Sequence, residues 1–151
     1  MAARILLDTN VLVYAHDRSE PDKQQQALQV LEQAQSTDTG ALTTQILAEF
    51  FVAVTRQLHA LLTREDAAHQ VELLARAWPV FDVTTFTVLE AIRGVRTYQM
   101  AYWDAQIWAS ARLNQIPIVL SEDFNVGAII EGVRFVNPFA EDFDLDAWWP
   151  G

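Results

Sequence analysis

The chain of 151 residues contains no cysteine and no long hydrophobic run. Without cysteine it can form no disulfide bond, no thiolate zinc site and no cysteine nucleophile. No charge-free apolar stretch approaches the ~18 residues that a membrane-spanning helix needs. The apolar run at residues 5–7 is also far shorter than the core of a signal peptide. We therefore expect a cytoplasmic protein that has no membrane partner.

Basic residues are scarce as well. The chain carries 10 Lys and Arg against 20 Asp and Glu, which gives a formal net charge of −10. Such a protein should have little general affinity for nucleic acids, because their phosphates repel it. Hydrophobic residues make up 51% of the chain, which argues against disorder. At this length the composition predicts one domain, over residues 1–151.

Short apolar runs alternate with amphipathic segments along the chain. The apolar runs predict five β-strands, at residues 5–7, 41–43, 80–83, 116–120 and 133–136. Helical spacing of apolar residues predicts helices at residues 22–35, 46–58, 63–75, 86–96 and 102–114. This alternation is typical of an α/β fold, and we expect a three-layer α/β/α sandwich with a five-stranded parallel sheet.

Four of the twenty acids stand among apolar neighbours. Asp8 and Asp123 follow predicted strands, and either could be an ordinary helix cap or turn residue. Glu49 lies in a strongly apolar predicted helix, where it could be a partly exposed glutamate. Asp104 has apolar residues at positions i−4, i+3, i+4 and i+7, so its burial without a partner would cost several kcal/mol. A structural role for Asp104 would need a buried arginine beside it.

Together these four acids predict a metal site. Ligands of open α/β sheets bind at the carboxyl ends of the strands, and acids on nearby helices can converge there. Four carboxylates that lie close together cannot all ionise without cations. Hard divalent ions with oxygen ligands, Mg²⁺ or Mn²⁺, are the usual solution, and one or two such ions serve phosphodiester cleavage.

Four segments carry a resemblance to a known family. They are residues 7–15 (LDTNVLVYA), 46–50 (ILAEF), 103–107 (WDAQI) and 120–124 (LSEDF). In this order they resemble the motifs of PIN-domain nucleases, especially the VapC-type toxins of type II toxin–antitoxin systems. The resemblance extends over residues 3–139, and an acidic tail with two tryptophans, residues 140–151, lies beyond it.

The resemblance implies a sheet with strand order 3-2-1-4-5 and an endoribonuclease that uses Mg²⁺ or Mn²⁺ to activate water. It also implies a homodimer that a cognate antitoxin neutralises by covering the active site. The implied catalytic and metal-binding residues are Asp8, Glu49, Asp104 and Asp123, of which Asp8 and Asp104 are the first choices for direct ligands. Asn10 and Ser121 match polar positions that support the site, although many relatives have threonine where Ser121 stands.

The remaining polar and aromatic residues have ordinary interpretations beside the functional ones. Arg56, Arg93 and Arg96 are candidates for contacts with RNA phosphates, although the ordinary interpretation of each is a solvated arginine. The three histidines match no metal-binding spacing. We expect the aromatic residues to lie mostly in the core or in a dimer interface and not to stack on bases.

Three alternative functions fit parts of the pattern. A phosphoacceptor domain or a haloacid-dehalogenase-like phosphatase also places Asp at strand ends with Mg²⁺, but it needs a lysine beside the phosphoryl group, and Lys23 is the sole lysine. A PIN-domain nuclease could process RNA without acting as a toxin. A binding module with an inactive site is the third alternative, against which the complete set of four acids argues.

Overall fold

The computed structural model describes residues 3–124 and 127–149. These residues form a six-stranded sheet with the order β3-β2-β1-β4-β6-β5. The strands are β1 (Ile5–Leu7), β2 (Gly40–Thr43), β3 (Val80–Phe81), β4 (Ile118–Leu120), β5 (Ile129–Ile130) and β6 (Val133–Val136). All neighbouring strands pair in parallel except β5, which pairs antiparallel with β6.

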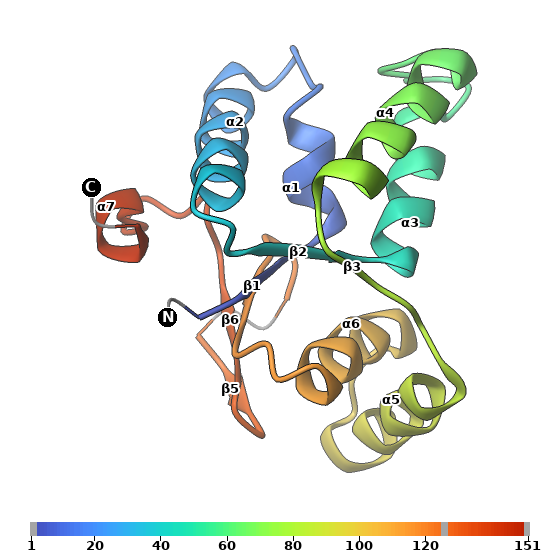
Figure 1. Ribbon diagram of the computed structural model, residues 1–151, viewed down its shortest axis with the longest axis vertical. Coiled ribbons are helices and arrows are strands. Elements are labelled where there is room, and N and C mark those ends of the chain that lie inside the picture. Colours follow the sequence, from blue (N-terminus) through green and yellow to red (C-terminus); the bar gives the residue numbers. More distant parts are fainter. Residues whose placement is uncertain (1–2, 125–126, 150–151) are drawn as a thin grey trace.

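Seven helices among the described residues cover this sheet. They are α1 (Thr9–Tyr14), α2 (Pro21–Ser36), α3 (Thr44–Val54), α4 (Arg64–Ala77), α5 (Thr85–Tyr98), α6 (Tyr102–Leu113) and α7 (Leu145–Trp148). Figure 1 shows α1 to α4 above the sheet and α5 and α6 below it. The predicted three-layer α/β/α sandwich is therefore confirmed, and its five parallel strands have the expected 3-2-1-4-5 order.

The structure differs from the expected elements in several places. The strand β5 was not expected, because two residues are too few to show a pattern. The helix α3 ends at Val54 and not at residue 58, because the chain turns back there and the amides of Leu61 and Leu62 both donate to the Val54 carbonyl. The short helix α7 lies in the acidic tail, where no element was expected.

The core lies on both faces of the sheet and reaches into the tail. Leu6, Leu7 and Phe135 on the strands are fully buried against helix residues such as Phe50 and Trp108, and each such side chain stabilises the fold by about 1.5–3 kcal/mol. In the tail, Trp149 is only 5% exposed, and its indole nitrogen donates to the buried Thr39 hydroxyl at 3.0 Å. None of the helices in the described ranges is apolar over a length that would cross a membrane.

Candidate active site

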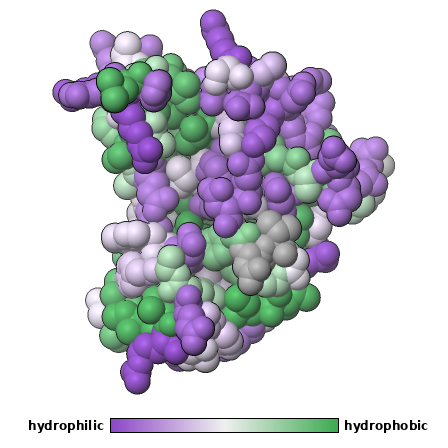
Figure 2. All heavy atoms as spheres, turned by 180° about the vertical axis from the view of Figure 1, so that it is seen from behind, coloured by the Kyte–Doolittle hydropathy of each residue, from purple (hydrophilic) through white to green (hydrophobic). Residues whose placement is uncertain are grey.

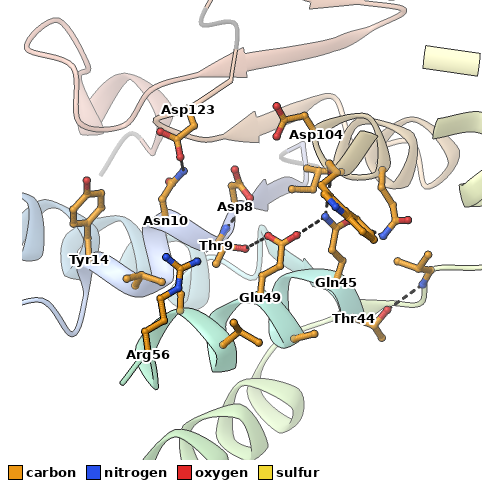
Figure 3. A pocket seen from close by; sticks show the side chains of 18 of the residues that line it. Asp8, Thr9, Asn10, Tyr14, Thr44, Gln45, Glu49, Arg56, Asp104 and Asp123 are labelled. Atoms are coloured by element: carbon orange, nitrogen blue, oxygen red, sulfur yellow. Dashed lines mark hydrogen bonds between the residues drawn. The ribbon is translucent and has the colours of Figure 1, made fainter. Parts of the chain in front are cut away.

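A pocket of about 990 Å³ opens at the carboxyl ends of the central strands, and all four predicted acids line it. Asp8 directly follows β1, and Asp123 follows β4 after two intervening residues. Glu49 comes from α3 and Asp104 from the first turn of α6. Figure 3 shows their side chains around one space, which is reached from four separate segments of the chain. We call Asp8, Glu49, Asp104 and Asp123 the acidic quartet.

Asp8 is the most deeply buried member of the quartet, with 6% of its surface exposed. It caps α1 by accepting from the Thr9 amide at 2.7 Å, and it accepts from the Ser121 hydroxyl at 2.6 Å. Burial raises the pKa of Asp8 from 3.8 to about 6, since these two hydrogen bonds only partly offset the desolvation and the charges of Glu49 and Asp104 raise it further. Asp8 therefore caps α1, as the alternative interpretation predicted, and it also lines the pocket.

Glu49 is held by two hydrogen bonds at the centre of the pocket. The Thr9 hydroxyl donates to one carboxylate oxygen at 3.1 Å, and the Gln45 amide donates to the other at 2.7 Å. The same Gln45 amide group also donates to the Trp103 carbonyl at 3.1 Å, and its oxygen accepts from Gln106 at 2.9 Å. This chain of contacts fixes α3 against α6 and thereby sets the position of Glu49 relative to Asp104.

The sequence interpretation missed Thr9, Gln45 and Gln106 as supporting residues. Both glutamines are buried, with exposed fractions of 8% and 6%. Both could have been noticed in the sequence, because each is an amide among mostly apolar helix residues. Gln45 lies four residues before Glu49, and Gln106 lies two residues after Asp104. A buried amide must find hydrogen-bond partners, so such residues predict a polar network inside the fold.

Asp104 is half-buried, and the structure gives it no hydrogen bond or ion pair with another described residue. Burial raises its pKa, and the charges of Asp123 and Glu49 raise it further. The arginine next along its helix, Arg112, pairs with Glu90 instead. The buried arginine partner that a structural role would need is therefore not supplied by the described chain.

Asn10 and Ser121, the two predicted supporting residues, connect Asp8 to Asp123. The Asn10 side-chain amide donates to the Ser121 hydroxyl at 3.2 Å and to an Asp123 carboxylate oxygen at 3.3 Å. The Ser121 hydroxyl also accepts from the Asp123 amide at 3.2 Å. The hydroxyl thus holds Asp8 and the Asp123 backbone in a common arrangement.

The three candidate arginines are divided between two surfaces. Arg56 lies just beyond α3 and lines the acidic pocket, and in Figure 3 its guanidinium points toward the quartet. Arg93 and Arg96 line a separate, smaller hollow on α5 with Leu89 and Ile92. Arg93 also pairs with Glu90 and Glu131. Arg56 is the only basic side chain among the described residues that line the acidic pocket.

Lys23 lies beside the acidic pocket, because its hydrogen-bond partner Tyr14 lines that pocket. It pairs with Glu122 at 2.8 Å and donates to the Tyr14 hydroxyl at 3.2 Å. It is not among the described residues that line the pocket. Since Lys23 is the sole lysine of the chain, the arrangement does not support a phosphoacceptor or phosphatase site of the kind considered above.

The acids surround the pocket without converging on one point. Across residues 3–124 and 127–149, no three Asp, Glu or His side chains already stand close enough to bind one ion. The hydrogen bonds contribute to this spread, because Thr9 and Gln45 hold Glu49 between α1 and α3, while Ser121 and Asn10 hold Asp8 and Asp123 at the end of β4. The donor chemistry is nevertheless that of a hard cation, with four carboxylates and no sulfur.

The family of the chain follows from its sequence. The family model for the PIN domain matches residues 5–129. The chain belongs to the PIN-domain family. The match includes all four members of the acidic quartet and both supporting residues, so the pocket lies within the part that this PIN domain shares with its family.

Solved structures resemble this PIN domain over most of its length. A toxin–antitoxin complex from Klebsiella pneumoniae matches with 19% identity and a TM-score of 0.63, covering 89% of this chain and 97% of the other. DNA-bound VapBC from Salmonella typhimurium matches with 16% identity and a TM-score of 0.63, covering 91% and 99%.

A third resembling structure is a nuclease toxin. VapC20 of Mycobacterium tuberculosis, a sarcin–ricin loop cleaving toxin, matches with 16% identity and a TM-score of 0.59, covering 86% and 98% of the two chains. No curated protein sequence matches this PIN domain. At these identities the structural likenesses establish the fold.

Proposed function

We propose that this PIN domain is a Mg²⁺- or Mn²⁺-dependent endoribonuclease and the toxin of a type II toxin–antitoxin pair. The observation that carries the proposal is the acidic quartet, because its four carboxylates come from separate parts of the chain and line one pocket, with a single arginine among the described lining residues. We further propose that residues 1–151 act as one nuclease domain in the cytoplasm.

The charge balance of the pocket supports a divalent cation. The pKa values of Asp8 and Asp104 are both raised by burial and by the neighbouring acids, so the four groups resist carrying their charges together. A cation relieves this repulsion, and the carboxylates are the ligands that Mg²⁺ and Mn²⁺ prefer. Asp8 and Asp104 would be the direct ligands, and small turns of the Glu49 and Asp123 side chains would complete the set around one or two ions.

The residues of the pocket would have different roles in phosphodiester hydrolysis. A bound ion of this kind lowers the pKa of a water molecule and neutralises charge on the phosphate. Thr9 and Gln45 hold Glu49, and Asn10 and Ser121 orient Asp123 and Asp8. Arg56 is placed to hold a phosphate of the RNA from the far end of α3.

The toxin role is supported by the structural likenesses and by one surface. Two of the resembling structures are toxin–antitoxin assemblies, and a third is a toxin that cleaves the sarcin–ricin loop. The helix α5 exposes Phe86, Leu89 and Ile92, by 76%, 60% and 43%. Figure 2 shows apolar side chains gathered over the lower part of the molecule, where α5 and α6 lie. Such a face suits the proposed homodimer.

Sequencing of RNA ends after induction of the protein tests this function. The wild type should create new ends at defined sites, and an Asp8→Asn variant that is produced at the same level should create none. The purified protein should cleave the same sites with Mg²⁺ or Mn²⁺ and stop when EDTA is added. Identical RNA ends from both proteins would refute the nuclease.

The toxin role needs a separate experiment. Induction should arrest growth, and co-expression of the neighbouring small open reading frame, as the antitoxin, should restore it. Cleavage without growth arrest and without such a neighbour would leave an RNA-processing nuclease as the correct function.

A further inference from the structure

Trp103 is an exposed aromatic side chain at the edge of the acidic pocket. Its indole is 64% exposed although it lines the pocket, and it is the residue directly before Asp104 on α6. The sequence interpretation expected the aromatic residues to lie in the core or in a dimer interface. Exposure of so large an apolar surface beside a polar site is unfavourable in water, which points to a ligand that covers it.

The position of Trp103 is fixed relative to the quartet. Its backbone carbonyl accepts from the Gln45 amide group at 3.1 Å, and the same group holds Glu49 at 2.7 Å. The ring of Tyr102 contacts the indole edge to face, with ring centres 5.0 Å apart and planes at 83°. The backbone at Trp103 is therefore tied to Glu49 through Gln45, and Tyr102 packs against the indole.

Trp103 and Arg56 lie at opposite ends of the acidic pocket. Gln45, which contacts Trp103, is in the first turn of α3, whereas Arg56 follows the last turn, and Glu49 lies between them. A helix of this length extends for about 16 Å. The pocket thus presents, in order along α3, the aromatic surface of Trp103, a group of carboxylates and the Arg56 guanidinium. Figure 3 shows Gln45, Glu49 and Arg56 in this order.

We propose that a nucleobase next to the cleaved phosphodiester bond stacks on the indole of Trp103 while Arg56 binds a phosphate on the other side of the quartet. This inference rests on the proposed ribonuclease function and identifies the substrate as a single-stranded segment, since a base within a duplex is already stacked on its neighbours. Val83 and Thr44 line the same end of the pocket and flank the base.

The charge of the protein favours this mode of binding. A net charge of −10 repels RNA at long range, and the described residues of the pocket supply one arginine to offset it. Stacking does not depend on charge and occurs with every base, because each base has a π face. An aromatic platform therefore gives this acidic protein affinity that its few basic residues do not provide.

The test compares RNA decamers that carry bases with a decamer of abasic residues of the same charge. Binding of fluorescein-labelled oligo(A), oligo(U) and the abasic chain is measured by fluorescence anisotropy with Mg²⁺ present, before cleavage. The wild type should bind the base-containing chains about tenfold more tightly than the abasic chain. Trp103→Leu should abolish this preference, and Trp103→Phe, which keeps a π face, should retain most of it.

Salt dependence separates stacking from phosphate binding. Trp103→Leu should weaken binding of the base-containing chains by the same factor at every KCl concentration. Arg56→Gln should instead reduce the slope of log K against log[KCl] by about 0.7, as expected for one phosphate contact on a single strand. On the RNA sites found by end sequencing, Trp103→Leu should raise KM more than it lowers kcat.

Leu28→Ala is the control for loss of exposed apolar surface, because Leu28 is 50% exposed on α2 and is not among the residues that line the pocket. It should behave as the wild type in both assays. The inference is overturned if the wild type shows no preference for bases, or if Trp103→Leu keeps that preference. Either of these binding results refutes only the stacking proposal if the wild type cleaves RNA and Asp8→Asn does not. If neither protein cleaves RNA, the proposed ribonuclease function itself is refuted.

Discussion

Glu131 and Asp8 are both carboxylates that accept a hydrogen bond from a hydroxyl group, yet their pKa values move in opposite directions. Glu131 accepts from Tyr98 at 2.6 Å and lies 2.9 Å from Arg93, and these contacts lower its pKa to about 2. Asp8 accepts from Ser121 at 2.6 Å, but burial and neighbouring acids raise its pKa to about 6.

The two regions differ in whether the fold supplies opposite charge. At the turn between β5 and β6, Arg93 and Arg112 together neutralise Glu90 and Glu131, which ties α5 and α6 to the sheet edge. In the acidic pocket, by contrast, the quartet and Asp17 give five carboxylates, and Arg56 is the one basic residue among the described lining residues. Because the pKa of Asp8 is raised, the free energy of unfolding of the metal-free protein at neutral pH is about 3 kcal/mol lower than it would be with an ordinary carboxyl at this position. Acids in this protein stabilise the fold where they are paired and are available for ligands where they are not.

The largest expected effect that separates the two regions is on catalysis. Asp104→Asn keeps the shape of the side chain but removes a charge from the quartet, so cleavage should fall by about a hundredfold or more. The same variant should be more stable than the wild type in EDTA, because repulsion within the pocket is reduced. Cleavage assays and melting curves with and without Mg²⁺ measure both effects.

Glu131→Gln is the control for this prediction, since it removes a charge from the paired region. It should keep full cleavage and the rise in melting temperature on addition of Mg²⁺, and Asp104→Asn should lose that rise. Full cleavage by Asp104→Asn would contradict the assignment of the quartet.

The second prediction concerns pH, where the two regions should have opposite slopes. Between about pH 4 and 6 the folded protein keeps the Asp8 proton that the unfolded chain has released, so stability should fall by about 3 kcal/mol as the pH rises. Between about pH 2 and 4.5 the folded protein has released the Glu131 proton that the unfolded chain keeps, so stability should rise with pH.

Urea unfolding in EDTA across the pH range measures these slopes. Subtraction of the Asp8→Asn and Glu131→Gln curves from the wild-type curve isolates each carboxylate. The Asp8 contribution should be constant above about pH 6 and the Glu131 contribution above about pH 4.5. If both difference curves have slopes of the same sign against pH, the prediction that the two regions respond oppositely to pH is wrong.

The smallest expected effect lies in the amide network that supports Glu49. Gln45→Met removes the donor to Glu49 and leaves the buried Gln106 amide without its partner, so the protein should lose about 1–3 kcal/mol of stability. Cleavage should fall about tenfold because Glu49 is less well oriented. Gln57→Met, at an exposed loop position, should change neither quantity. Equal stability of the two variants would argue against the network.

The sequence predicted the layers of the fold and the acids of the pocket for the same reason. Strands of a parallel sheet are short apolar runs, and a carboxylate among apolar residues is conspicuous, so both are visible in local patterns. The two amides of Gln45 and Gln106 are visible as polar residues on apolar helices, but a single sequence contains no pattern that pairs residues 61 positions apart. The ion pair of Arg93 with Glu90 could have been predicted from the sequence, since residues three positions apart on a helix are neighbours.

The order of the segments around the pocket has a practical consequence. Residues 82–84 connect β3 to α5, and the part of the chain before them carries Asp8 and Glu49, whereas the part after them carries Asp104 and Asp123. The two parts meet where β1 pairs with β4 and where Gln106 contacts Gln45. A chain divided in this connector would yield two fragments, each of which carries two members of the acidic quartet. Nuclease activity would then report on their reassociation, which makes the connector a site for building a split enzyme whose output depends on the proximity of two fused proteins.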